Sequence, residues 1–85
     1  MIKNIVTSEH YTWGEHCDGW RMLDTTDLSV IQERVPPNCG ERLHHHRRAR
    51  QLFFILEGRL RITVRTEVFH LSAGDTLEVA PMETH

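Results

Sequence analysis

Cysteine is scarce in this chain of 85 residues, because only Cys17 and Cys39 occur. Two thiols are too few for a disulfide framework, so the composition favours a reducing compartment. No long apolar run is present, and the opening "MIKNIVTSEHYTWGEH" lacks the apolar centre of a signal peptide. The net charge of −2 gives no global support for nucleic-acid binding. These absences predict a cytoplasmic protein that contacts neither a membrane nor a nucleic acid.

The short length limits the size of the core. A chain of 85 residues forms one domain at most, and many such chains rely on a metal, disulfides or a partner subunit for stability. The apolar fraction of 39% and the charged fraction of 26% are those of an ordinary globular protein. Arginine is concentrated between Gly40 and Thr66, and the rest of the chain is acidic. We therefore expect one folded domain with a locally cationic segment.

Helical periodicity is hard to find, and the chain is better described as short strands separated by turns. The pattern predicts a strand over Leu28–Val35, ended by Pro36 and Pro37. The stretch "QLFFILEGRLRITVR" contains two β-prone runs around Glu57-Gly58. Glycine at the second position of a two-residue loop is typical of a tight hairpin turn. We therefore predict that these two runs pair with each other.

The stretch "EVFHLSAGDTLEVAP" repeats this arrangement. It predicts strands over Glu67–Leu71 and Thr76–Ala80, a turn over Ser72–Asp75, and an end at Pro81. Short strands at roughly ten-residue spacing are typical of an antiparallel sandwich or barrel. The sequence thus predicts an all-β fold.

Alternation along the predicted strands assigns the two faces. Gln51, Phe53 and Ile55 share one face, because side chains two residues apart point the same way. Across the predicted Glu57-Gly58 turn, Ile55 opposes Leu60. The expected interior face therefore continues through Leu60, Ile62 and Val64. The opposite face carries Leu52, Phe54 and Leu56, which would need cover from the segment holding Trp13 and Trp20 or from a second subunit.

Three consecutive histidines raise the question of a metal. On a strand His44 and His46 point the same way and can reach one ion, while His45 faces away. Imidazole suits zinc, nickel, copper and iron. On spacing alone, a metal site and a solvated cationic loop explain "HHHRRAR" equally well.

The wider spacing adds a resemblance. Gly40, His44-x-His46, Gln51 and Gly58 are followed by Gly74, Pro81 and His85. This arrangement resembles the two signature motifs of the cupin superfamily, and "VAPMETH" is similar to the family's Pro-Gly-x-x-His loop with Met82 in place of glycine. The resemblance implies a cupin-type antiparallel β-barrel or jelly roll. It also implies one domain over residues 1–85, with an N-terminal arm and first strands in 1–27 and the barrel core in 28–85.

The resemblance also implies a metal site. His44 and His46 match the paired histidines, His85 matches the last histidine, and Gln51 occupies the position of a glutamate. The expected metal is nickel, iron, manganese or zinc. A glutamine amide is neutral and cannot titrate, so we expect weaker metal binding than with glutamate and a preference for anionic ligands. The alternative is a degenerate site that binds no metal and hydrogen-bonds a ligand through Gln51.

Function is predicted only as a class. The first hypothesis is a metal-binding cupin acting on a small polar or anionic molecule, with Arg42, Phe53 and Ile62 as substrate-binding residues. The alternative is a non-catalytic ligand-binding or sensor cupin, and a third is a scaffold acting through the Leu52, Phe54 and Leu56 face. Whether the protein is an enzyme is left open.

The position of His85 leads to one more expectation. A cupin barrel normally continues past its last histidine with further strands, so the resemblance implies a C-terminally truncated barrel. An unpaired sheet edge invites pairing with another chain. We therefore expect a homodimer.

Overall fold

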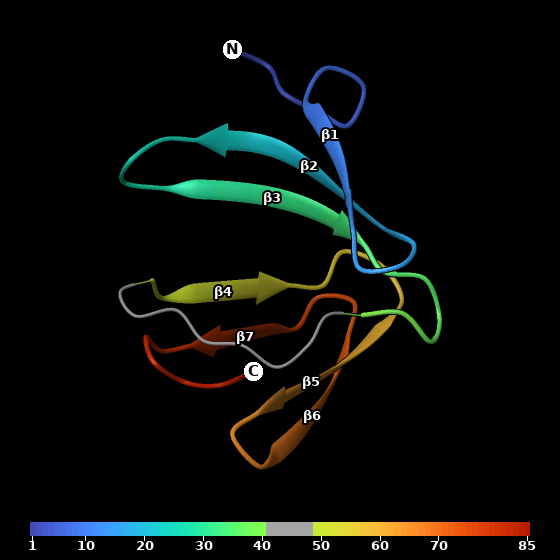
Figure 1. Ribbon diagram of the computed structural model, residues 1–85, viewed down its shortest axis with the longest axis vertical. Coiled ribbons are helices and arrows are strands. Elements are labelled where there is room, and N and C mark those ends of the chain that lie inside the picture. Colours follow the sequence, from blue (N-terminus) through green and yellow to red (C-terminus); the bar gives the residue numbers. More distant parts are fainter. Residues whose placement is uncertain (41–48) are drawn as a thin grey trace. The chain divides into compact units, whose positions relative to one another are not determined.

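The computed structural model describes residues 1–40 and 49–85, and all of their regular structure is β (Figure 1). The strands are β1 (Glu9–Trp13), β2 (Cys17–Asp24), β3 (Ser29–Arg34), β4 (Gln51–Phe54), β5 (Arg59–Val64), β6 (Glu67–Ser72) and β7 (Thr76–Val79). Every strand pair is antiparallel. In this part of the chain no helix is long and apolar enough to span a membrane. The all-β, antiparallel prediction is confirmed.

The chain divides into two compact units, Met1–Arg42 and Leu43–His85. In the first unit, β1, β2 and β3 form a meander in which each strand pairs with the next one along the chain. β3 confirms the strand predicted over Leu28–Val35. It ends just before the two prolines, which have no N–H to donate to a neighbouring strand.

A close contact between β1 and β2 explains one glycine of the first unit. Gly19 lies opposite Tyr11, and a Cβ atom at Gly19 would sit 2.4 Å from Cζ of the tyrosine ring. Only glycine leaves room for the ring to lie across the strand. The Arg21 guanidinium lies 4.4 Å from the centre of the same ring, which adds a cation–π contact. The tyrosine therefore holds the two strands together as a packing residue.

The second unit pairs its strands in a nested order. β5 and β6 form a hairpin through the two residues Arg65 and Thr66, and β4 pairs with β7 on either side of that hairpin in the sequence. The predicted pairing of β4 with β5 around Glu57-Gly58 is therefore wrong. Gly58 does adopt a positive φ of 78°, but the bend directs the chain away from β4 instead of back along it.

Backbone hydrogen bonds at Ile55 give the physical reason. The Ile55 N–H donates to the carbonyl oxygen of Asp75 at 3.0 Å, and the Gly74 N–H donates to the carbonyl oxygen of Ile55 at 2.8 Å. Both polar groups of Ile55 are thus satisfied by the turn before β7. None remains to pair with Leu60, which the structure places opposite Leu71 instead.

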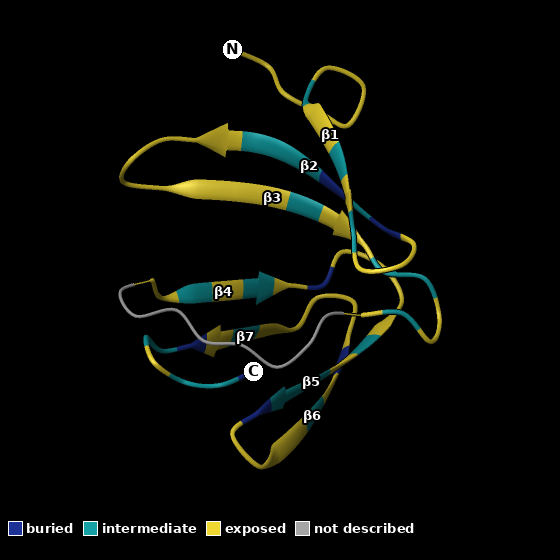
Figure 2. Cartoon of the chain, viewed as in Figure 1, coloured by how far each residue is buried: buried dark blue, intermediate teal, exposed yellow. Residues whose placement is uncertain are grey.

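The predicted faces are confirmed although the pairing is not. In the described part of this unit, the buried apolar residues are Ile55, Val64, Leu71 and Val79, each 8% exposed or less. Figure 2 colours the buried stretches of the chain dark blue. On the opposite face Leu52, Phe54 and Leu56 are 67%, 58% and 66% exposed. Alternation is a property of a single strand, so it survives a change of partner. That a second subunit covers this apolar face stays a prediction.

The described strands do not close into a barrel. They form three separate sheets, β1-β2-β3, β4-β7 and β5-β6. The jelly-roll class is thus supported by strand type and direction, and no closed barrel is seen among residues 1–40 and 49–85.

Candidate functional site

The predicted site residues fall into two groups. His44, His46 and Arg42 lie outside the described residues. Gln51, Phe53, Ile62 and His85 lie inside them, all in the second unit. Gln51 and Phe53 are on β4 and Ile62 is on β5, where it pairs with Phe69.

Gln51 presents a buried oxygen atom. It is the first residue of β4 and pairs with Val79, which is 1% exposed. The side-chain Oε1 is buried and accepts no hydrogen bond from any residue that the structure describes. A buried amide oxygen without a partner costs about 1–3 kcal/mol, so such an oxygen usually meets a donor or a cation. Gln51 therefore has the chemistry of a neutral oxygen ligand.

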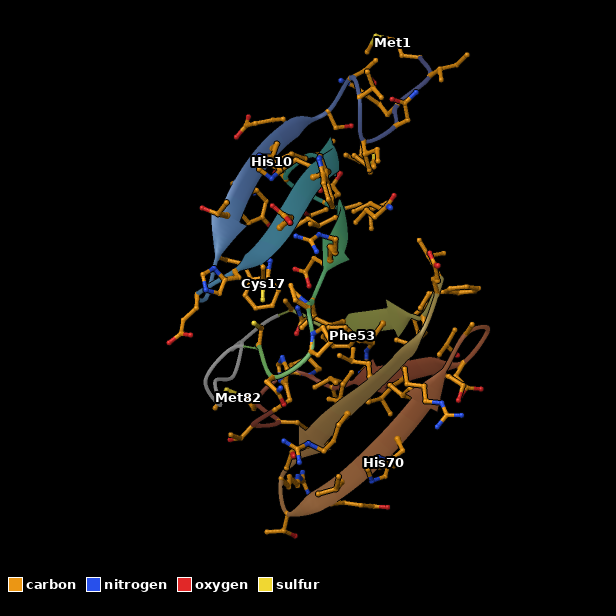
Figure 3. The ribbon with its side chains drawn as sticks, turned by 90° about the vertical axis from the view of Figure 1, so that its right-hand side faces the viewer. Met1, His10, Cys17, Phe53, His70 and Met82 are labelled. Atoms are coloured by element: carbon orange, nitrogen blue, oxygen red, sulfur yellow. The ribbon has the colours of Figure 1, made fainter. Side chains whose placement is uncertain are left out.

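His85 presents its ring to the same face of β4. The residue is 9% exposed, and its ring lies edge-on to Phe53 with the ring centres 6.0 Å apart. Phe53 (labelled in Figure 3) is two residues after Gln51 on β4, and residues two apart on a strand share a face. Gln51 and His85 are thus brought to one face of β4.

A hydrogen bond assigns the tautomer of the neutral His85 ring. Its Nδ1 lies 3.0 Å from the carbonyl oxygen of Glu83. A carbonyl oxygen only accepts, so Nδ1 carries the proton, and in the neutral ring Nε2 then carries the lone pair. Metal-binding histidines usually donate their other N–H to a carbonyl or carboxylate in this way.

The loop that carries His85 is built on a tight turn. The Glu83 N–H donates to the carbonyl oxygen of Ala80 at 3.2 Å, and Met82 has a φ of 71°. Proline followed by a residue with positive φ is the pattern of a type II turn, in which glycine is preferred at the second position. This explains why the related motif has glycine where this chain has Met82. A side chain in that conformation costs about 1–2 kcal/mol.

Two residues that sequence reasoning missed hold this loop. The Glu83 carboxylate accepts a hydrogen bond from the Ala80 N–H at 2.8 Å, and its other oxygen lies 3.4 Å from Nε of Arg65. The Arg65 N–H also donates to the carbonyl oxygen of Thr84 at 2.7 Å. The β5–β6 turn and the end of β7 therefore fix the approach of His85. The sequence feature that could have revealed this support is the carboxylate of Glu83, two residues after Pro81.

A second polar cluster lies in the first unit. The Asp18 carboxylate on β2 is 2.8 Å from Nε2 of His10 on β1 and 2.7 Å from a guanidinium nitrogen of Arg34 on β3. The hydrogen bond from His10, followed by that from Arg34, lowers the pKa of Asp18 below its ordinary value. Because Asp18 joins all three strands, we interpret the cluster as a cross-strand support. The sequence alone did not single out His10.

Cys17 is a buried thiol that belongs to neither of these polar clusters. Its side chain is fully buried at the start of β2, and burial raises the pKa of its thiol. Both cysteines are free thiols. A buried, protonated thiol is a packing residue and a poor nucleophile.

Among residues 1–40 and 49–85, no group of three or more His, Cys, Asp or Glu side chains is arranged to hold a metal ion. Of the four predicted ligands, this part of the chain contains one amide, Gln51, and one histidine, His85. The His85 ring contacts Phe53, which shares a face of β4 with Gln51, and the ligand roles of His44, His46, Gln51 and His85 stay predictions.

Comparisons with known proteins agree with this architecture. A family model described as "Cupin domain" matches residues 31–85, so the chain belongs to the cupin family. An uncharacterized protein of Methanocaldococcus jannaschii, MJ1618, is 33% identical over 57 residues, which are 67% of this chain and 46% of that protein. The matched stretch is thus less than half the length of that relative. No solved structure matches the chain. The resemblance expected from the motifs is confirmed at the level of the family.

Proposed function

We propose that this chain is a metal-binding cupin that holds a divalent transition metal through His44, His46, Gln51 and His85. The second part of the proposal is that a small polar or anionic molecule binds at the same place. Nickel, iron, manganese and zinc all suit a site made of imidazoles and one oxygen. The family membership supports the general class, and the ligand set is our inference.

One observation carries the proposal: Gln51 has a buried oxygen that accepts no hydrogen bond from any described residue, on the face of β4 where Phe53 contacts His85. The Nδ1 hydrogen bond to Glu83 supports the same conclusion, because it orients the ring and makes Nε2 the nitrogen that would bind a metal. An ordinary core position would favour an apolar residue at 51, since burying the amide is costly.

The charge of the proposed site favours an anion. Three imidazoles and an amide are all neutral, so a divalent ion bound by them would keep its double positive charge and polarise an oxygen of the bound molecule. Phe53 and Ile62 would contact the apolar part of that molecule, and Arg42 would pair with its carboxylate or phosphate. These residues define a ligand class and leave the reaction open.

A second candidate function is a ligand-binding or sensor cupin without catalysis. The observation that favours it is the amide at position 51. A glutamate there would be able to exchange protons with a substrate, whereas glutamine cannot. In this candidate Gln51 donates and accepts hydrogen bonds to the ligand, and no metal is needed.

Metal analysis of the purified protein tests the proposal. We expect about one metal ion per chain in the wild type, a loss of bound metal in His46→Ala, and no loss in His45→Ala, whose side chain is predicted to face away. The neighbouring histidine is a matched control, because both variants remove one imidazole from the same tripeptide. A wild-type protein that stays metal-free after incubation with nickel, iron, manganese and zinc would favour the sensor candidate instead.

A further inference from the structure

One face of the β5–β6 hairpin gathers hydrogen-bond donors. The register places Arg59 opposite Ser72 and Arg61 opposite His70, and all four side chains are exposed. We call these four residues the donor face. They line a surface hollow of about 470 Å³ together with Leu60 and Leu71. Figure 3 shows His70 on β6, alongside β5.

The donor face is positively charged and has no carboxylate of its own. On the same side of the hairpin the next cross-strand pair is Thr63 and Val68, which carry no charge. Glu67, the one acidic residue within β5 and β6, directly precedes Val68 and pairs with Val64, so it points to the opposite side of the hairpin. The Asp75 carboxylate, just after β6, accepts a hydrogen bond from the Ser72 backbone N–H.

The two arginines of this face differ from the other described arginines. Ion pairs to carboxylates are made by Arg21, Arg34, Arg50 and Arg65. Within the described part of the chain, neither Arg59 nor Arg61 makes such a pair. Cationic side chains next to each other on a sheet repel, so an arrangement of this kind is favoured when an anion lies between them.

We propose that the donor face binds a phosphate group, either as inorganic phosphate or as a phosphomonoester. Arg59 and Arg61 lie two residues apart on one strand, about 7 Å between their Cα atoms, so two long side chains can converge on one anion. Guanidinium groups bind phosphate oxygens through two parallel N–H bonds. The Ser72 hydroxyl and a ring N–H of His70 supply further donors.

This phosphate site is separate from the proposed metal centre. Gln51 belongs to the β4–β7 sheet, and the residues of β5 that share the interior face are Leu60, Ile62 and Val64. Arg59 and Arg61 alternate with these apolar residues and point to the other side of β5. The inference therefore stands or fails independently of metal binding.

The test is a titration of the full chain, pretreated with a chelator so that no metal contributes to the signal. Inorganic phosphate and glycerol phosphate are titrated by calorimetry at constant ionic strength, with chloride as the balancing anion. We expect saturable binding of one anion per chain. A tighter complex with glycerol phosphate would assign the site to phosphomonoesters, and equal or weaker binding would assign it to inorganic phosphate.

Substitutions locate the site. In Arg59→Gln/Arg61→Gln the affinity should fall at least about tenfold, because two charge-assisted hydrogen-bonding groups are lost. Arg50→Gln removes a guanidinium that is already paired with Glu78, and its affinity should match the wild type. If the double variant does not fold, Arg59→Lys/Arg61→Lys is used instead. It keeps both positive charges but loses the paired N–H donors of the guanidinium groups, so it should bind phosphate several-fold more weakly than the wild type. Equal affinity in wild type and folded donor-face variants, or no saturable binding, would overturn the proposal.

Discussion

The two units of this chain are held together in different ways. In the first, strands that follow one another in sequence pair directly, and the Asp18 carboxylate bonds to side chains of both neighbouring strands. In the second, β4 pairs with β7 across the whole β5–β6 hairpin, and the buried apolar residues of its described part include Ile55, Val64, Leu71 and Val79. Strands that follow one another in the sequence lose little loop entropy when they pair, so polar contacts between them can suffice to hold the pairing. A nested pairing needs a buried apolar face to define its partner.

The comparison predicts that, in the second unit, burial of apolar side chains makes the largest contribution to the free energy of unfolding. Val79 is 1% exposed and pairs with Gln51, so Val79→Ala removes buried methyl groups and leaves a cavity. We expect the free energy of unfolding to fall by about 2 kcal/mol. Val68→Ala is the matched control, because Val68 is 48% exposed on β6 and its loss should cost no more than about 0.5 kcal/mol. Urea unfolding measures both, and equal losses would contradict the account.

In the first unit we expect a smaller effect that depends on pH. The folded state lowers the pKa of Asp18 from its ordinary 3.8, so near that pH the unfolded chain binds more protons than the folded one. The stabilisation is therefore fully present above about pH 4 and is lost as the pH falls through the lowered pKa. Asp18→Asn should be less stable than the wild type at pH 7 and should approach it in acid.

Acid unfolding monitored by circular dichroism checks this prediction. Asp24→Asn serves as the control, because it removes the same charge from the exposed end of β2 without breaking an ion pair of the described residues. Its curve should run parallel to that of the wild type. A constant difference between Asp18→Asn and the wild type from pH 7 to pH 2 would show that the cluster does not act through its charge.

The fold was predictable where the signal is local. Alternation over Gln51–Phe54 and Arg59–Val64 gave the correct faces, and the two prolines correctly marked the end of β3. The partner of β4 was not predictable, because Glu57-Gly58 has the composition of a hairpin turn. What decides the pairing is a set of backbone bonds from Ile55 to residues near Gly74, and these depend on the tertiary arrangement.

The candidate site shows the same division. Motif spacing singled out Gln51 and His85 as candidate ligands, and that role stays a prediction. The structure adds a buried Oε1 on Gln51 and a ring contact between His85 and Phe53, two residues further along the same strand. The supports of His85 were missed, because Arg65 and Glu83 meet only once the hairpin and the last loop are folded. Met82 was noted as a departure from glycine, and its positive φ gives the physical reason why glycine is usual there.

The central claim is that the Gln51 oxygen is a metal ligand, and a competitive metal titration of Gln51→Glu tests it most directly. Replacing the neutral oxygen by an anionic one in direct contact with a divalent ion should strengthen metal binding at least about tenfold. A circular dichroism spectrum matching the wild type shows that the sheet is retained. We predict tighter binding in the variant than in the wild type. The same affinity in both proteins would contradict the account, because it would place position 51 outside the ligand set.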